Sequence, residues 1–552
     1  MSTLRALTGE FLALEAKIQT GGGPAAIARQ HEKGRLTARE RIQKLVDPGT
    51  FFQECGLWAA HEMYKDHGGA PAAGAVTGIG VIHGRRCMII ANDATVKAGA
   101  FFPMTAKKII RAQNIAMMAR LPLVYLVDSA GVYLPLQEEV FPDTDDFGRV
   151  FRNNAVASAM GVPQIAAIMG FCVAGGGYLP VLCDTLLMTE GSGLYLAGPA
   201  LVKAAIGQEV SDEELGGAEM HAQISGTIDF REKDDHACIE RIRSLVAKYQ
   251  VPVRPARSGP SPHASPDRAY DIFTDKPGAQ FDVRDLIACW VDSAARRNAE
   301  GLESLTPDFD EYKAEYGQTI VCGYASIGGY PCGIVANQKK TVQRTMPGGK
   351  SGPSKSVQMP GVIYDDASDK AARFILDCNQ RKVPLVFVHD TTGFMVGRDS
   401  EQGGIIKAGA KMVNAMANST VPKIVLITGG SYGAGNYAMC GRAFDQFLAL
   451  AWPSAKFAVM GANQATGTLA TIEAKGRERR GEVLDAEAKK QIYAAVHASY
   501  TEQADIRHGA ARGWVDRIID PARTRDELVA ALAAADQGWD YSVRFSTGVL
   551  QV

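Results

Sequence analysis

Short apolar runs alternate with amphipathic segments along most of the chain. The runs LPLVYLVD at 121–128 and VPLVFVHD at 383–390 have the length and the β-branched and aromatic content of buried strands, and each ends in an aspartate. Residues 106–118 and 370–376 instead place their apolar positions at helical spacing. Strands that alternate with helices in this way predict an α/β fold.

Three segments of the first half recur in the same order in the second half. Residues 87–92 (CMIIAN) match 332–337 (CGIVAN), residues 121–131 match 383–393, and residues 162–178 match 421–437. Three matches in one order indicate an internal duplication, so we expect two tandem α/β domains of common design.

The domain boundary is predicted in a segment rich in proline, serine and glycine, residues 251–272, because this composition disfavours a long helix or a central strand. We therefore expect one domain at 1–260 and a second at 261–552. A chain of 552 residues is long enough to give each domain its own core.

Composition and charge exclude several classes of partner. The chain has 59 Lys and Arg against 60 Asp and Glu, so it has no net field to attract nucleic acid or an anionic membrane. Apolar residues make up 46%, yet no run approaches the ~18 consecutive apolar residues that a membrane helix needs. Glu10, Glu15 and Lys17 favour an amphipathic N-terminal helix over a signal peptide or a mitochondrial address, so we expect a cytoplasmic protein.

The ten cysteines are scattered, without a C-x-x-C pair or a dense cluster. This distribution favours reduced thiols in the core, and we expect no metal site.

Two glycine-rich turns carry the candidate chemistry. Each follows an apolar strand and precedes a predicted helix that begins near Tyr178 or Tyr437; the turns are Ala174-Gly175-Gly176-Gly177 and Gly433-Ala434-Gly435-Asn436. Small residues leave backbone N–H groups bare, and such donors at the start of a helix form an anion site or an oxyanion hole. The alternative is that the glycines only let a helix pack closely on a strand; the duplication favours the functional interpretation. Neither turn has the G-x-G-x-x-G or G-K-[ST] pattern of a nucleotide site.

Asp128 and Asp390 end matching strands, where ligands of open α/β sheets collect. Capping of the following turn is the alternative role, and it is the one we favour, because Asp before Ser-Ala-Gly or Thr-Thr-Gly is ordinary turn chemistry. His389 and His221 have no Ser or Cys nucleophile in a recognisable elbow nearby, so we expect structural roles for them.

With these motifs in place, nearly the whole chain resembles the carboxyltransferase (β) subunits of biotin-dependent acyl-CoA carboxylases. It looks most like the methylcrotonoyl-CoA carboxylase type, and Leu134, Pro135 and residues 138–142 are among the features less like propionyl-CoA enzymes. The matching stretches are HEKGRLTARER (31–41), ANDATVK (91–97), EVFPD (139–143), FGR (147–149), LVKAA (201–205), ELGGA (214–218), TGFMVGR (392–398) and GAGNYAMCGR (433–442).

The resemblance implies a crotonase-like fold of the ClpP/crotonase superfamily in each half. It implies that the first domain binds the acyl-CoA, that the second binds carboxybiotin, and that the active site lies between domains of two subunits. It also implies a β6 ring within an α6β6 assembly, in which a separate α subunit supplies the biotin carboxylase and the biotin carrier. The chain itself has no Met-Lys-Met biotin-attachment motif.

Carried over by position, Gly175 and Gly176 donate N–H groups to the thioester oxygen, and Ala434 and Gly435 donate to the ureido oxygen of biotin. The neighbours Ala174, Gly177, Tyr178, Gly433 and Asn436 are assigned to substrate binding. The resemblance implies a reaction without a side-chain base, because carboxybiotin that has released CO2 is basic enough to deprotonate the acyl group, whose enolate then attacks the CO2.

Two segments depart from the methylcrotonoyl pattern and leave the substrate open. The segment 338–355 is longer and more basic than expected. It is either a loop that contacts CoA phosphates or a partner subunit, or a solvated surface loop. Residues 66–71 also differ from the pattern. We expect 3-methylcrotonoyl-CoA, with propionyl-, geranoyl- or acetyl-CoA, or a biotin-dependent decarboxylase, as alternatives. A hydratase or isomerase of the crotonase type does not need the second turn, and an inactive scaffold would not keep both turns free of bulky residues.

Overall fold

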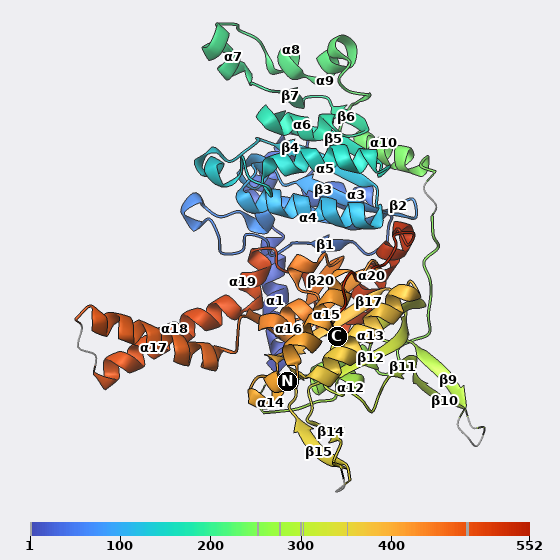
Figure 1. The fold of residues 1–552 in the computed structure, drawn as a ribbon. Coiled ribbons are helices and arrows are strands. Elements are labelled where there is room, and N and C mark those ends of the chain that lie inside the picture. Colours follow the sequence, from blue (N-terminus) through green and yellow to red (C-terminus); the bar gives the residue numbers. More distant parts are fainter. Residues whose placement is uncertain are drawn as a thin grey trace.

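Two eight-stranded sheets carry the two halves of the chain in the computed structural model (Figure 1). The structure describes residues 3–250, 253–274, 276, 278–297, 301, 303–349, 352–481 and 485–551. In the first sheet β1, β2 and β3 pair antiparallel, and the strands from β3 onward pair parallel. Its strands are β1 (Gln53–Cys55), β2 (Ala75–Ile82), β3 (Arg85–Asn92), β4 (Leu123–Ser129), β5 (Gln164–Val173), β6 (Thr185–Thr189), β7 (Gly193–Tyr195) and β8 (Phe230–Glu232).

The second sheet repeats this topology strand for strand. Its path β11-β12-β13-β17-β19-β20-β22, with β21 paired to β19, matches β1-β2-β3-β4-β5-β6-β8 with β7 paired to β5. Both sheets also have a register shift at the same place, between Val127 and Ser129 in the first sheet and between His389 and Thr391 in the second. The predicted duplication of a crotonase-like α/β unit is confirmed. The strands are β11 (Phe309–Tyr312), β12 (Ile320–Ile327), β13 (Tyr330–Asn337), β17 (Leu385–Thr391), β19 (Lys423–Tyr432), β20 (Leu448–Ala451), β21 (Lys456–Ala458) and β22 (Arg517–Ile518).

Helices cover both faces of the first sheet because its central strands are apolar on both sides. On β4, Val124 and Leu126 pack in a cluster with Ile42 and Ile239, whereas Tyr125 packs in a second cluster with helix α4. The two predicted helical segments lie within α4 and α13. The covering helices are α3 (Ala38–Leu45), α4 (Pro103–Ala119), α5 (Phe147–Ala159) and α10 (Asp235–Ala247), and in the second half α13 (Asp365–Gln380) and α15 (Ile405–Ala417).

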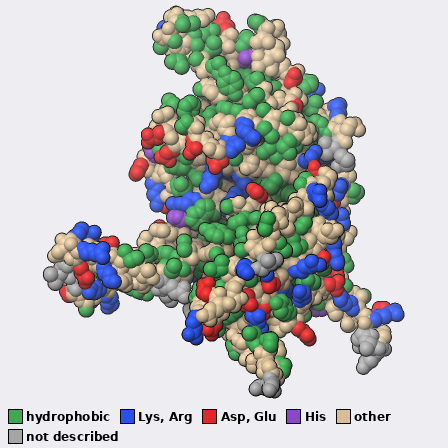
Figure 2. Space-filling view, viewed as in Figure 1, with side chains coloured by type: hydrophobic (Ala, Val, Ile, Leu, Met, Phe, Trp, Pro, Cys, Tyr) green, Lys and Arg blue, Asp and Glu red, His purple; other side chains and the backbone are tan. Residues whose placement is uncertain are grey.

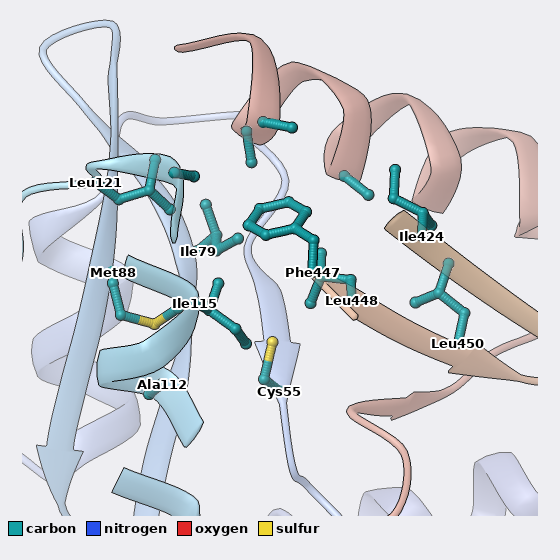
Figure 3. Packing of buried hydrophobic residues seen from close by; sticks show 14 of the residues in the cluster. Cys55, Ile79, Met88, Ala112, Ile115, Leu121, Ile424, Phe447, Leu448 and Leu450 are labelled. Carbon is teal, nitrogen blue, oxygen red and sulfur yellow. The ribbon is translucent and has the colours of Figure 1, made fainter. Parts of the chain in front are cut away.

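The two halves are joined by exchange of their terminal helices. Helix α1 (Thr3–Ile18), the predicted N-terminal helix, buries Phe11 and Ile18 in the core of the second half, and α20 (Thr524–Gly538) contacts α4 as well as β12 and β13. One apolar cluster is continuous across the joint, and Figure 3 shows Phe447 and Leu448 close to Ile79. The boundary at 260/261 stays a prediction, and residues 251–252 of the predicted linker lie outside the described residues.

Four segments project from the two halves (Figure 1). After β7 come α7 (Pro199–Ile206), α8 (Asp212–Gly216) and α9 (Ala218–Met220), and at the equivalent place after β21 come α17 (Ala462–Arg479) and α18 (Ala486–Ala504). Figure 2 shows hydrophobic side chains on the α7–α9 projection and Lys and Arg on the α17–α18 arm. The other two are the hairpins β9 (Ser293–Arg297) with β10 (Glu303–Pro307) and β14 (Val342–Met346) with β15 (Ser354–Gln358).

The basic segment 338–355 forms the β14–β15 hairpin, of which Lys350 and Ser351 lie outside the described residues. Its cations pair with acids of the same half: Lys339 with Asp390 at 3.1 Å, Lys340 with Asp282 at 2.5 Å and Arg344 with Asp365 at 2.6 Å. These three pairs anchor the base of the hairpin.

The remaining elements are short. They are α2 (Pro24–Glu32), α6 (Tyr178–Val181), α11 (Ala269–Ile272), α12 (Val283–Ile287), α14 (Arg398–Gln402), α16 (Gly433–Ala438), α19 (Ile506–Ala511), β16 (Val362–Ile363) and β18 (Gly393–Phe394). Among the helices of the described residues, none combines the length and the hydrophobicity needed to cross a bilayer.

A buried carboxylate fixes the two halves to each other. Asp516 Oδ1 accepts hydrogen bonds from Arg111 Nε at 2.9 Å and Arg442 Nη1 at 3.1 Å, and Oδ2 accepts from Arg111 Nη2 at 2.7 Å and from the Ala449 N–H at 2.8 Å. Its backbone oxygen accepts from the Gly56 N–H at 2.6 Å. Arg111 belongs to the first half and Asp516 to the second, so this cluster couples them directly.

We predict that Asp516→Asn destabilises the protein and removes part of its acid sensitivity. Burial would raise the pKa of Asp516, but the attraction of Arg111 and Arg442 and the hydrogen bonds outweigh it and hold the pKa well below its usual range. The stabilisation is therefore complete above the unfolded-state pKa of about 3.9 and is lost progressively as the pH falls from that value to the lower pKa of the folded state. Breaking the buried cluster costs about 3–5 kcal/mol at neutral pH. Urea unfolding at several pH values measures both effects; parallel curves for wild type and variant would contradict the assignment.

Candidate active site

The two glycine-rich turns occupy equivalent places in the two sheets. Strand β5 ends at Val173 and leads through the 3₁₀ turn Ala174–Gly177 into α6, and β19 ends at Tyr432 and leads directly into α16. Both turns thus lie at the carboxyl end of a central parallel strand, where α/β proteins bind ligands. The predicted order of strand, turn and helix is confirmed in the first half; in the second half the prediction of a helix beginning near Tyr437 is wrong, because α16 begins at Gly433 and contains the predicted turn.

The first residue of each turn is left-handed, with φ of 56° at Ala174 and 51° at Gly433. This conformation reverses the chain between strand and helix, and it costs a residue with a Cβ about 1–2 kcal/mol. The exposure pattern is also shared, because Gly175 and Ala434 are exposed whereas Gly176 and Gly435 are buried. Each turn is followed by a half-exposed tyrosine, Tyr178 or Tyr437, at 51% and 55%.

A hydroxyl clamp lies beside each turn. Ser129 Oγ donates to the Gly99 carbonyl at 2.7 Å and accepts from the Gly131 N–H at 3.2 Å. Thr391 Oγ1 donates to the Gly361 carbonyl at 3.0 Å and accepts from the Gly393 N–H at 3.0 Å.

The clamps hold Gly131 and Gly393 against the turns. A Cβ on Gly176 would be 3.8 Å from Gly131 Cα, and a Cβ on Gly435 would be 3.1 Å from Gly393 Cα. The sequence argument did not select the clamp residues, although they lie inside the repeated segments 121–131 and 383–393 and the repeat is the signal that marks them.

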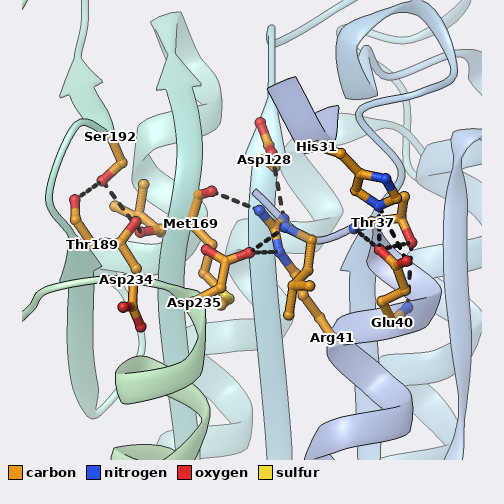
Figure 4. A network of polar contacts seen from close by, with 12 residues as sticks. His31, Thr37, Glu40, Arg41, Asp128, Met169, Thr189, Ser192, Asp234 and Asp235 are labelled. Carbon is orange, nitrogen blue, oxygen red and sulfur yellow. Dashed lines mark hydrogen bonds and ion pairs between the residues drawn. The ribbon is translucent and has the colours of Figure 1, made fainter. Parts of the chain in front are cut away.

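Asp128 and Asp390 bind the strands that lead into the two turns. Asp128 accepts from the Phe171 N–H at 3.3 Å and pairs with Arg41 at 3.3 Å, as Figure 4 shows for the ion pair. Asp390 accepts from the Gly430 N–H at 3.0 Å and pairs with Lys339. Burial raises the pKa of both carboxyls, and the paired cations oppose that rise. The prediction that these acids cap the turn that follows them is wrong: the N–H groups that their carboxylates accept from belong to the neighbouring strand, β5 or β19.

The two histidines are structural. His389 is fully buried, with Nε2 at 2.5 Å from the Met439 carbonyl and Nδ1 at 2.9 Å from Ser431 Oγ. Burial lowers the pKa of His389 to about 4, so it is neutral at physiological pH. His221 Nε2 lies 2.8 Å from the Leu194 carbonyl. Both rings are held by backbone oxygens.

The second turn lines a cavity, and another cavity reaches the residue that precedes the first turn. Gly433, Ala434, Asn436 and Tyr437 line a cavity of 580 Å³ that also includes Trp514. A cavity of 770 Å³ reaches Val173, the residue before the first turn, and its lining contains four cations, Arg29, Lys33, Arg35 and Lys97.

One chain does not bring the two turns together. Figure 1 shows α6 in one half and α16 in the other, with α4 and α5 between them in the view. Within the described part of the chain, no group of three His, Cys, Asp or Glu side chains is arranged to hold a metal ion. The ten cysteines are free, and all but Cys183 are buried.

Two duplicated halves, each with a turn of small residues at the end of a central parallel strand, are the arrangement of a tandem crotonase-like fold. A family profile described as "Carboxyl transferase domain" matches residues 29–544. The chain is 42% identical over 529 residues to "Methylcrotonoyl-CoA carboxylase beta chain, mitochondrial" of Arabidopsis thaliana, which covers 94% of this chain and 84% of that protein. It is 41% identical to "Biotin-dependent 3-methylcrotonyl-coenzyme A carboxylase beta1 subunit" of Mycobacterium tuberculosis, over 96% of this chain and 94% of that one.

Among solved structures, the β subunit of P. aeruginosa geranyl-CoA carboxylase superposes with a TM-score of 0.81 at 33% identity, over 100% of this chain and 96% of that one. The chain therefore belongs to the family of carboxyltransferase subunits of biotin-dependent acyl-CoA carboxylases. The family identification made from the sequence motifs is confirmed.

We predict that substitutions of the first residue of each turn change the free energy of unfolding in opposite directions. Ala174→Gly relieves the left-handed strain and should raise the free energy of unfolding by up to about 1 kcal/mol. Gly433→Ala adds a Cβ 2.8 Å from the Val459 carbonyl oxygen and should lower that free energy by about 1–3 kcal/mol. Urea unfolding of both variants measures the difference; a loss of stability in Ala174→Gly would show that the first turn is not strained.

Proposed function

We propose that the chain transfers a carboxyl group from carboxybiotin, carried by a partner subunit, to the enolate of an acyl-CoA, with 3-methylcrotonoyl-CoA as the substrate. The observation that carries the proposal is the duplicated turn: two equivalent sets of backbone donors, each at a strand end, the second lining a cavity and the first directly following a residue that lines one. Relatives named as 3-methylcrotonoyl-CoA carboxylase subunits support the choice of substrate.

The first half is assigned to the acyl-CoA. Gly175 and Gly176 donate N–H groups to the thioester oxygen, and Ala174, Gly177 and Tyr178 surround the acyl group. The four cations of the adjoining cavity are suited to the phosphates of CoA, because Lys and Arg bind phosphate by charge-assisted hydrogen bonds. An enolate oxygen held by two amides is stabilised by a few kcal/mol per donor.

The second half is assigned to the biotin ring. Ala434 and Gly435 donate to the ureido oxygen, and Gly433 and Asn436 shape the entrance. The cavity has apolar walls from Phe457, Val459 and Trp514 and is large enough for a bicyclic ring. Carboxybiotin supplies CO2 and a basic ureido nitrogen there. Since the chemistry needs no side-chain base, the chain has to position two oxyanions and exclude water.

A complete site needs a second copy of the chain, because the two turns of one chain lie apart (Figure 1). We propose a homo-oligomeric ring, β6 within an α6β6 assembly, whose α subunit carries the biotin carboxylase and the biotin. The half-exposed Tyr178 and Tyr437 suit a surface that a neighbouring subunit covers. The cytoplasmic location stays a prediction, and some relatives are named as mitochondrial.

The function is tested by ATP- and bicarbonate-dependent carboxylation with the partner subunit. Across 3-methylcrotonoyl-, geranoyl-, propionyl- and acetyl-CoA, we expect the highest kcat/KM for the first. The cysteamine thioester of the same acid lacks the phosphates and should show a KM raised about tenfold or more. A preference for another thioester would overturn the substrate, and decarboxylation without carboxylation would favour a decarboxylase.

The site residues are tested with Gly176→Val and Gly435→Val. Each side chain would fill the gap beside Gly131 or Gly393, so transfer should fall about 100-fold or more. Gly435→Val should still bind the acyl-CoA with unchanged affinity, because only the second half is altered. Gly9→Val is the matched control, since a Cβ on Gly9 meets nothing within 4 Å. Full transfer in both turn variants would refute the assignment.

A further inference from the structure

The segments that follow the two turns differ by one cation. Arg442 lies in the segment between Tyr437 and β20, which is longer than the matching segment between Tyr178 and β6. The first half has no Lys or Arg from Ala174 to Val202. A guanidinium that directly follows the turn in the sequence is therefore a feature of the second half.

Arg442 lines the cavity of the second turn. It shares the 580 Å³ cavity with Gly433 and Ala434, it also lines the 830 Å³ cavity between the halves together with Asp516, and its side chain is 29% exposed. Among the described residues that line the cavity of the second turn there is no Asp or Glu, and His508 is the only other side chain in the lining that can carry a positive charge. The cavity thus combines bare backbone donors, a cation and no acid, which selects an anionic ligand.

The charge of Arg442 is only partly compensated. Asp516 is its ion-pair partner at 3.1 Å, but the same carboxylate is held at both oxygens by Arg111. Two guanidiniums share one carboxylate, which leaves an excess positive charge at the cavity. Asp445 lines the separate cavity of 830 Å³ between the halves and not that of the second turn.

The lowered pKa of Arg442 is consistent with an excess of positive charge around it. Burial, together with repulsion from Arg111, lowers the pKa of Arg442 to about 10, so it remains charged at neutral pH while lacking a full counter-charge. A partly buried cation without a full counter-charge is stabilised when an anion binds beside it.

We propose that Arg442 binds the transferable carboxylate of carboxybiotin while Ala434 and Gly435 bind the ureido oxygen. The inference rests on the proposed function of the second turn. It explains the asymmetry, because a thioester is neutral before reaction whereas an N-carboxylated ring carries a negative charge from the start. Asp516 then acts as a positioning residue that holds the guanidinium at the cavity wall.

The test is equilibrium binding to the full-length oligomer, measured by ligand-observed NMR titration. The probes are biotin methyl ester and its N1-carboxymethyl derivative, a stable carboxylate at the position of the transferred group. We expect Arg442→Met to weaken binding of the anionic probe about tenfold or more and to leave the neutral probe within about twofold. Arg442→Lys, which keeps the charge but loses the planar fork, should give an intermediate loss.

Arg111→Met is the companion variant, because Arg111 also binds Asp516 but lines only the cavity between the halves. Its removal leaves Asp516 to compensate Arg442 alone, so it should also weaken the anionic probe selectively, by less than Arg442→Met, and leave the neutral probe within about twofold. Equal losses for both probes in Arg442→Met, with circular dichroism unchanged, would overturn the inference and leave the second turn as the biotin site. If wild type binds neither probe, the proposed function of the second half fails as well.

Discussion

A tight reversal at the end of a central parallel strand is the constraint on which both half-sites depend. The chain must leave the strand, pass through one left-handed residue and start a helix with its first N–H groups facing a cavity. That path leaves little room beside the second turn, where a Cβ on Gly435 would lie 3.1 Å from Gly393 Cα, whereas a Cβ on Gly176 would be in ordinary contact with Gly131 at 3.8 Å. The hydroxyl clamps of Ser129 and Thr391 fix the opposing loops, so the donors are arranged before a ligand arrives.

Duplication supplied two such arrangements, which differ in the charged side chains around them. The cavity next to the first turn is lined by four cations, which suit the phosphates of CoA. The second turn has a single partly compensated guanidinium in its own cavity, which suits a charge on the reacting group itself. The backbone geometry is common to both sites, whereas specificity comes from charged side chains around it.

The same charged cluster links the site to the architecture. Asp516 couples Arg111 of the first half to Arg442 beside the second turn, and α1 and α20 extend the cores of the two halves into one another. The halves are thus held in a fixed relation. Their two turns nonetheless lie apart in one chain, which makes a second copy necessary for a complete site (Figure 1).

The sequence by itself determined the α/β class, the duplication and the two turns, because strand periodicity, glycine content and the order of repeated segments are local properties that survive in one dimension. Its prediction that Asp128 and Asp390 cap the turns that follow them was wrong. Only the tertiary structure decided that those acids bond to the neighbouring strand, that Ser129 and Thr391 clamp the loops beside the turns, and that Arg442 lines both the cavity of the second turn and the cavity between the halves. These contacts join residues far apart in the chain, and the balance of charge around Arg442 exists only after Arg111 and Asp516 have been folded against it.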